Sequence, residues 1–113
     1  MEEFVEKSYL FDFYGELLTE HQRRIYTAVI FEDLSPSELA KEEGISRQGV
    51  HDMIHRCDRI LADYEKRLHL VEKFLNIRKN IRTIQELTGE VSRNTEERMH
   101  EISRISSQIL EEL

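Results

Sequence analysis

The sequence predicts an all-α protein, and three observations carry that prediction. The chain of 113 residues holds only one Pro and four Gly, so few residues interrupt a helix. Apolar residues make up 39% of the chain and recur at spacings of three and four, with no convincing strand-like alternation. Helix-capping residues precede several of these periodic stretches. A chain of this length supports one domain with a helical extension.

The stretch 35–61 predicts a helix-turn-helix. Ser35 is an N-cap and Pro36 takes the first helical position, which together mark a helix start. Gly44 suits the sharp turn because a left-handed backbone costs glycine little, and Ser46 can cap the second helix. The second helix carries one apolar seam, which we expect to be buried. The seam comprises Val50, Met53, Ile54, Cys57 and Leu61.

A plain helical hairpin is the alternative interpretation of this stretch. Glu43, directly before the turn, occupies a position where the motif usually has an apolar residue, and we expect it to loosen the packing there. Small Ala40 lets the two helices approach closely. Because the cap, turn and seam residues agree with one another, they favour the helix-turn-helix.

Two further helices are predicted before the motif. Thr19 and Gln22 have the spacing of a capping box, and Ile25 recurs helically with the apolar residues after it. Before them we expect an aromatic-rich amphipathic helix. Its apolar residues are Phe4, Tyr9, Leu10, Phe13, Leu17 and Leu18.

The pieces LFDFY, LLTE-Q, DLS-SE-A and SRQ-V-D lie between Tyr9 and Phe74. In identity and spacing they resemble the YlxM family of small bacterial helix-turn-helix proteins, over roughly the first two-thirds of the chain. The resemblance implies a fold like region 4 of sigma-70 factors. It also implies a regulatory or accessory role in the signal recognition particle pathway, since family genes typically stand beside the gene for that particle's GTPase. It implies no enzymatic activity.

We therefore expect a helix-turn-helix domain at residues 1–62 and a helical extension or hairpin at residues 63–113. The apolar pattern runs on past residue 62, either as one continuous helix or with a bend near His69. Gly89 ends this element, and Asn94 or Thr95 starts another. The two helical stretches then form an antiparallel pair.

This extension carries apolar residues that need a cover. They can pack on the N-terminal helices of the same chain, but a four-helix unit of about sixty residues is already of the size that folds alone. We therefore expect a homodimer, with this region as its dimerisation surface. The predicted contact residues are Phe74, Ile77, Ile81, Ile84, Ile102, Ile105 and Ile109.

The net charge of −7 opposes nucleic-acid binding at long range. Residues 1–62 hold 7 basic and 13 acidic side chains, a net charge of −6, and the remainder holds 9 and 10, a net charge of −1. A local basic surface can still bind DNA, because the Debye length at physiological salt is only ~8 Å.

The exposed face of the second motif helix is the candidate DNA-binding surface. Arg suits guanine edges and phosphates, Gln suits adenine, and recognition helices read bases with their first turns. The alternative is an ordinary solvated face. The candidate residues are Arg47, Gln48, His51, Asp52, His55 and Arg56, with Arg59 further along the same arc.

His51 and His55 also invite a metal interpretation, because HDMIH resembles the HExxH zinc motif. The acid is Asp52 rather than Glu and no third ligand is evident, so we predict no metal site, no cofactor and no catalytic residues. The single Cys57 and the absence of a signal peptide lead us to expect a cytoplasmic protein. No apolar run approaches the length of a membrane span, so we expect no membrane insertion.

One basic run stands out in this acidic chain. Between residues 73 and 85 the charged residues are Lys73, Arg78, Lys79 and Arg82, with no acid among them. The run is a candidate contact for RNA or a protein partner, and the alternative is a solvated helix face. Two functions follow: a DNA-binding regulator, or an adaptor that binds the signal recognition particle GTPase and its RNA but not DNA.

Overall fold

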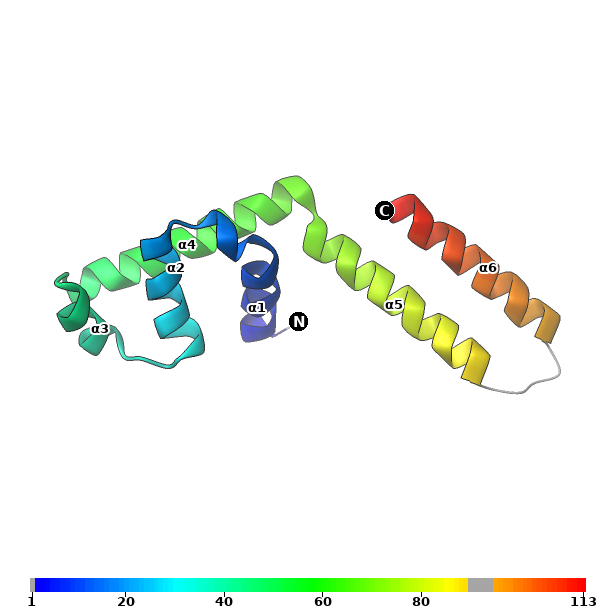
Figure 1. Cartoon of the computed structure of the whole chain (residues 1–113), viewed down its shortest axis with the longest axis horizontal. Helices are drawn as coiled ribbons and strands as arrows, with labels where there is room; N and C mark the ends of the chain where they lie inside the picture. The colour runs from blue at the N-terminus through cyan, green and yellow to red at the C-terminus, as the bar shows by residue number, and fades with distance from the viewer. Residues whose placement is uncertain (1, 90–94) are drawn as a thin grey trace. The chain divides into compact units, whose positions relative to one another are not determined.

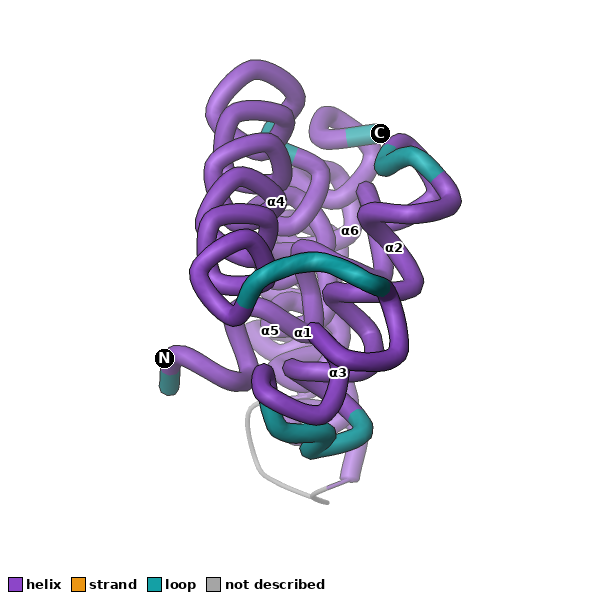
Figure 2. Tube along the Cα trace, turned by 90° about the vertical axis from the view of Figure 1, so that its left-hand side faces the viewer, coloured by secondary structure: helices purple, strands orange, loops and turns teal. Residues whose placement is uncertain are grey.

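A computed structural model of the chain describes residues 2–89 and 95–113, all of them in helices and the short loops between them (Figure 1, Figure 2). The helices are α1 (Glu3–Tyr14), α2 (Glu20–Tyr26), α3 (Pro36–Glu43), α4 (Arg47–Leu68), α5 (Leu70–Gly89) and α6 (Thr95–Glu112). A 3₁₀ turn, η1 (Gly15–Leu17), follows α1, and a π-helical segment, η2 (Thr27–Phe31), follows α2. The predicted all-α class is confirmed.

The predicted helix starts and the predicted turn are all present. Gln22 and Thr19 make a reciprocal capping box, in which the Gln22 backbone N–H donates to Thr19 Oγ1 over 3.1 Å. Ser35 Oγ accepts from the third residue of α3, and Ser46 Oγ accepts from the Gly49 N–H at the start of α4, over 2.9 Å. Gly44 ends α3 with φ 69° and ψ 29°, a left-handed conformation that allows α4 to begin three residues later.

The chain divides into two compact units, Met1–His69 and Leu70–Leu113. Of the two alternatives that the sequence left open, the bend is the one observed, because His69 adopts a left-handed backbone with φ 57° between α4 and α5. The boundary that we placed between residues 62 and 63 lies inside α4, which continues for six more residues to Leu68.

The core of the first unit is built on the predicted seam of α4. Val50, Cys57 and Leu61 are fully buried, Ile54 is nearly so, and Met53 is half-buried at the edge. In Figure 1, α1, α2 and α3 all lie on one side of α4. They contribute Tyr14, Ile25, Tyr26, Leu39 and Ala40 to the core.

The expected apolar face of α1 was partly wrong. Phe4 and Phe13 are 56% and 37% exposed, whereas Tyr14 is buried. Phe11 stacks on Tyr26 with 5.8 Å between ring centroids, so α1 meets the core through Phe11 and Tyr14. The physical reason is that large aromatic rings on several sides of a short helix leave periodicity alone unable to choose the packed side.

In the second unit α5 and α6 form an antiparallel pair (Figure 1). Ile105 is buried, and the Arg98 guanidinium donates to the Leu87 carbonyl over 3.2 Å, which ties the start of α6 to the end of α5. Gly89 is the last residue of α5 and Thr95 the first of α6, while Asn94, the alternative start, lies outside the described residues. Over the described ranges, none of the helices combines the length and hydropathy of a bilayer span.

Candidate nucleic-acid interface

The start of α4 is a favourable place for a negatively charged ligand. Ser46 caps the helix, and its first turn contains no acidic residue. The side chains of Arg47 and Gln48 are exposed there. Because a helix N-terminus carries a partial positive charge, the backbone N–H groups and the Arg47 guanidinium both attract an anion there.

The structure places all six predicted DNA-binding residues along the first half of α4. Five of them are exposed: Arg47, Gln48, Asp52, His55 and Arg56. His51 is half-buried, at the margin of the core. The Gln48 side-chain amide donates to Asp52 Oδ1 over 2.9 Å. This hydrogen bond holds the Asp52 side chain along the helix surface.

The exposed face continues beyond the predicted residues. At about 100° per residue, Arg59, Lys66 and Arg67 lie on the same arc as Arg56, and all three are exposed. Lys66 and Arg67 were not predicted as part of the site because we ended the domain at residue 62. The helical spacing of Arg56, Arg59 and Lys66 could have revealed them, had the helix been extended to its true end.

Two of the four acids of α4 are held on its core side. The Tyr26 hydroxyl donates to Asp58 Oδ1 over 2.7 Å, and Lys7 Nζ lies 3.5 Å from the other oxygen of that carboxylate. The Tyr14 hydroxyl donates to Glu65 Oε1 over 2.5 Å. Burial, followed by the hydrogen bond to Asp58, raises the pKa of Tyr26 far above its ordinary value, so Tyr26 remains a donor.

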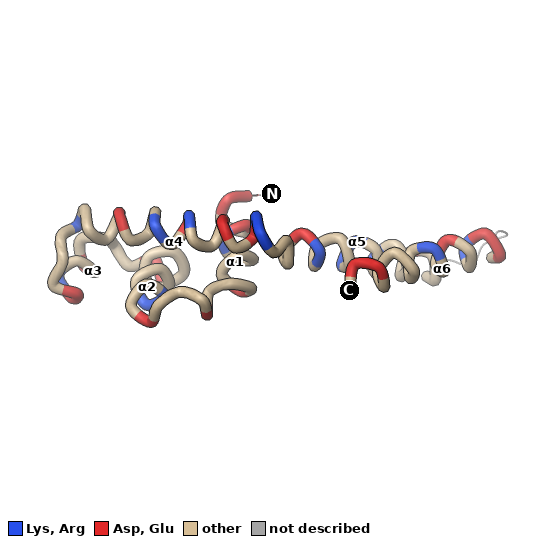
Figure 3. Tube along the Cα trace, turned by 90° about the horizontal axis from the view of Figure 1, so that it is seen from above, with Lys and Arg blue, Asp and Glu red and all other residues tan. Residues whose placement is uncertain are grey.

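The exposed face of α4 is therefore more basic than the sequence of the helix implies. Figure 3 shows Lys and Arg interspersed with Asp and Glu along α4. With Asp58 and Glu65 turned to the tyrosines, the acids left on the exposed face are Asp52 and Asp63, and Asp63 pairs with Arg67 over 3.3 Å. The basic residues of that face are Arg56, Arg59, Lys66 and Arg67, and the exposed Arg47 flanks it at the start of the helix.

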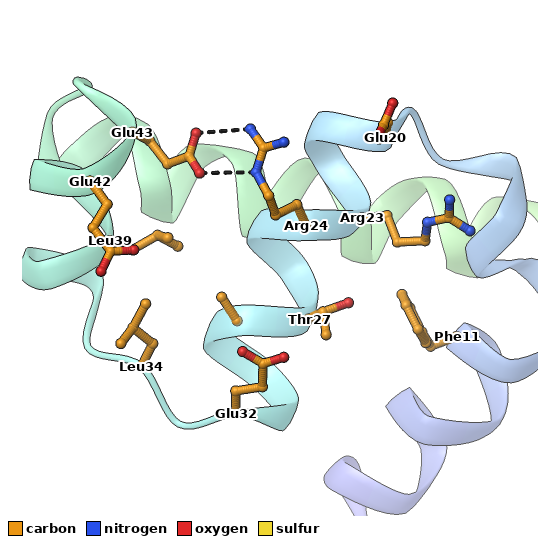
Figure 4. Close-up of a pocket in the computed structure, with 11 residues that line it drawn as sticks. Phe11, Glu20, Arg23, Arg24, Thr27, Glu32, Leu34, Leu39, Glu42 and Glu43 are labelled. Atoms are coloured by element: carbon orange, nitrogen blue, oxygen red, sulfur yellow. Dashed lines mark hydrogen bonds and ion pairs between the residues drawn. The ribbon is translucent and has the colours of Figure 1, made fainter.

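Glu43 does not loosen the corner of the motif, as we had expected it to. Its two carboxylate oxygens each accept from the Arg24 guanidinium over 3.0 Å (Figure 4). His21 Nε2 lies 3.6 Å from one of these oxygens. The Arg24 hydrogen bonds hold the pKa of Glu43 below its ordinary value. A charged residue fits this position because α2 supplies a two-pronged partner for it.

The two histidines of α4 are not gathered with further ligands. Among the described residues, no group of three His, Cys, Asp or Glu side chains with converging ligand atoms includes His51 or His55. Cys57, the third residue type that could bind a metal here, is buried in the core, and that burial raises the pKa of its thiol to about 11. A buried thiol of raised pKa is a packing residue rather than a metal ligand.

The candidate residues of the hairpin fall on several sides of it. Lys73, Arg78, Lys79 and Arg82 are all exposed, but at about 100° per residue Lys73 points away from the other three. Of the predicted dimerisation residues, Phe74 and Ile81 are 39% and 45% exposed. Ile77, Ile84, Ile102 and Ile109 are half-buried, and Ile105 is buried.

Comparison with known proteins agrees with this geometry. Residues 1–102 match the model of the UPF0122 family, which is described as "Putative helix-turn-helix protein, YlxM / p13 like". The chain belongs to the UPF0122 family. That family is described as one of helix-turn-helix proteins, in agreement with the resemblance that the sequence showed.

Three relatives illustrate how far the likeness extends. A UPF0122 protein of Clostridium kluyveri is 46% identical over 80 residues, covering 71% of this chain and 72% of the relative. One of Clostridium botulinum is 44% identical over 81 residues, covering 72% and 74%. A UPF0122 protein of Bacillus cereus is 37% identical over 97 residues, covering 86% and 88%. The family model, which matches as far as residue 102, includes α5 and the first part of α6.

Proposed function

We propose that this UPF0122 protein is a DNA-binding regulator that reads DNA with the exposed face of α4. One observation carries the proposal: Arg56, Arg59, Lys66 and Arg67 lie along that face with Arg47 flanking it at the helix start, while tyrosine hydroxyls hold Asp58 and Glu65. The helix-turn-helix family to which the chain belongs supports the same function.

The position of each residue along α4 indicates whether it contacts bases or phosphates. Arg47, Gln48 and His51 lie in its first turn and a half, where recognition helices contact base edges. Arg56 and Arg59 follow at a spacing suited to backbone phosphates, and phosphate contacts supply most of the affinity that is independent of sequence. Because the whole chain is acidic, binding depends on close contacts and is sensitive to salt.

Titration of the protein against labelled genomic fragments, followed by fluorescence anisotropy at several salt concentrations, tests this proposal. If Arg56, Arg59, Lys66 and Arg67 each neutralise a phosphate, log K falls with log salt at a slope of about −3.6. Arg56→Ala reduces that slope by about 0.9. Arg47→Ala costs about 1–3 kcal/mol of binding free energy and relaxes the preference for one fragment over another.

Arg104→Ala on α6 is the matched control, since Arg104 is exposed and pairs with a residue of its own helix, Glu101. It leaves both affinity and slope unchanged. Absence of binding at low salt refutes the proposal, and binding that is indifferent to Arg47 and Arg56 moves the contact away from α4.

A second candidate function is an adaptor of the signal recognition particle, binding its GTPase and RNA. The supporting observation is that Lys73, Arg78, Lys79 and Arg82 are all exposed on α5, with no acid between them in sequence. Replacing all four with Glu removes association with the RNA-containing particle if this proposal is correct, and circular dichroism checks that helicity is kept. If the fourfold variant associates as wild type does, the basic run is only a solvated helix face. If the wild type binds neither the GTPase nor the RNA, the adaptor proposal is refuted.

A further inference from the structure

The first unit contains a hollow that the α4 face does not use. It has a volume of about 520 Å³ and is lined by residues of α1, α2, η2, α3 and the loop before α3, with none from α4. Its apolar lining comprises Phe11, Ala28, Leu34 and Leu39. Phe11 and Leu34 are only half-buried, so apolar surface is open to a ligand there. We call this hollow the acidic groove, because of the charges around it.

Exposed acidic side chains surround the apolar lining, and they come from three different segments. Glu20 is the first residue of α2, Glu32 directly follows η2, and Glu42 lies near the end of α3. All three line the groove, and Figure 4 shows them around the space. The acids are therefore spread along the rim of the groove rather than gathered at one point of it.

Basic residues do not offset these acids. Arg24 and Glu43 also line the groove, but they pair with one another through two hydrogen bonds of 3.0 Å. Arg23 is the remaining cation of the lining, against three acids.

The surface around the groove has the same sign of charge. Residues 1–46, which form α1 to α3, hold 4 basic and 11 acidic side chains, a net charge of −7. The α4 helix holds 5 basic and 4 acidic side chains, a net charge of +1. The net negative charge of the chain is therefore concentrated on the helices that line the groove, and it attracts a positively charged partner to that side.

We propose that the acidic groove binds a basic amphipathic helix of another protein, with apolar residues along one face and Lys or Arg beside them. Amphipathic helices bind proteins by laying their apolar face in a groove, and complementary charges at the rim select the partner. The apolar lining receives the apolar side chains of that helix. The carboxylates of Glu20, Glu32 and Glu42 meet its cations.

This groove gives the first unit a second binding surface, of opposite charge to the α4 face. DNA is repelled from the groove, because the phosphates and the rim carry charge of the same sign. A basic helix is repelled from the α4 face for the converse reason. The two ligands do not compete for residues, because the groove is lined without α4. The inference stands whether or not α4 binds DNA.

A synthetic peptide of Leu and Lys, spaced so that the leucines share one face of a helix, tests the inference. The labelled peptide is titrated with the full chain and followed by fluorescence anisotropy, and wild type binds it at tens of micromolar or below. A peptide with Ala in place of each Leu keeps the charge but binds about tenfold more weakly or worse, because less apolar surface is buried. A peptide with Glu in place of each Lys does not bind.

Matched variants of the protein locate the contact. Glu32→Lys/Glu42→Lys weakens binding of the Leu–Lys peptide by about tenfold or more, because like charges then oppose one another at the rim. Glu6→Lys/Glu16→Lys makes the same change in net charge at two exposed acids outside the groove, and it changes the affinity by less than about twofold. Circular dichroism checks the helicity of both. If the groove variant is less helical than wild type, Glu32→Gln/Glu42→Gln replaces it, with Glu6→Gln/Glu16→Gln as its control.

A measurement on the wild type alone does not depend on how the variants fold. When leucine methyl groups are isotope-labelled, the magnetic resonance signals of Leu34 and Leu39 shift on addition of the Leu–Lys peptide. The signal of Leu110, an exposed residue of α6 that does not line the groove, keeps its position.

Four results overturn the inference. They are a wild type that does not bind the Leu–Lys peptide at tens of micromolar, equal binding of the Ala peptide, equal loss of affinity in the groove variant and its control, and unchanged signals of Leu34 and Leu39. Light scattering then identifies what the groove does instead. If the wild type binds no peptide and only the groove variant changes the protein from dimer to monomer, the groove holds a second copy of the chain. If the mass is also unchanged, the acids form a solvated surface.

Discussion

Tyr26→Phe tests the hydrogen bond that keeps Asp58 on the core side of α4. The Tyr26 side chain is fully buried, and its hydroxyl donates to the Asp58 carboxylate over 2.7 Å. A hydrogen bond to a charged group contributes roughly 1.5–3 kcal/mol to stability. Asp58 keeps a side chain that is 30% exposed and a Lys7 ammonium 3.5 Å away, so water and a cation partly replace the lost donor. We therefore expect a loss at the lower end, about 1.5 kcal/mol.

Thermal and urea unfolding, followed by circular dichroism, measure this loss. For a unit of this size about 1.5 kcal/mol lowers the unfolding midpoint by roughly 6–12 °C. Tyr64→Phe is the matched control, because Tyr64 stacks on Tyr14 but its hydroxyl makes no hydrogen bond among the described residues. The control changes the midpoint little. If Tyr26→Phe is as stable as Tyr64→Phe, the hydroxyl does not hold Asp58, and the argument that tyrosines sort the charges of α4 fails.

Two further predictions concern Gly44 and Cys57. Gly44→Ala lowers the free energy of unfolding by about 1 kcal/mol in urea titrations, because φ is 69° and an added Cβ meets nothing within 4 Å that could offset the strain. Gly89→Ala, also with open space around the added Cβ but without a positive φ, does not destabilise, and equal effects at both glycines contradict the strain argument. The Cys57 thiol, whose pKa burial raises from 9.0 to about 11, is alkylated at pH 8 at least ~100-fold more slowly than an unfolded cysteine, because the thiolate is the reactive form. Because burial raises this pKa, the protonated thiol contributes stability that is fully present below pH 9 and is lost as the pH rises towards 11. Alkylation of the folded protein as fast as that of the unfolded chain would show that the thiol is not buried.

Features encoded by neighbouring residues could be predicted from the sequence. The caps at Thr19, Ser35 and Ser46 and the turn at Gly44 each depend on side chains and backbone groups within a few residues of one another. The α4 seam repeats with the helical period over four turns, which makes its buried side unambiguous. Of the six candidate residues of α4, Gln48, Asp52, His55 and Arg56 follow from that seam as its opposite side, and Arg47 and His51 flank them.

Features that depend on residues distant in the chain could not be predicted from the sequence. Glu43 meets Arg24 from 19 residues away, Asp58 meets Tyr26 from 32, and Glu65 meets Tyr14 from 51. No local pattern shows that these acids are satisfied, so the sequence suggested a loosened corner at Glu43 and gave no sign that Asp58 and Glu65 are held by tyrosines. A bend near His69 was predicted only as an alternative to a continuous helix, because a residue with a side chain rarely adopts a left-handed backbone and the apolar period continues across the break.

The tyrosine–carboxylate bonds have a thermodynamic consequence for the chain. In the unfolded state nothing separates the Asp58 and Glu65 carboxylates from the basic residues around them. The basic surface of α4 therefore forms only when α1 and α2 bring Tyr14 and Tyr26 to the helix. A polyanion that binds this surface thus recognises the folded ensemble alone. By mass action it shifts the folding equilibrium by about 2.7 kcal/mol at a hundred times its dissociation constant. An acidic protein is in this way stabilised by a ligand of its own charge sign.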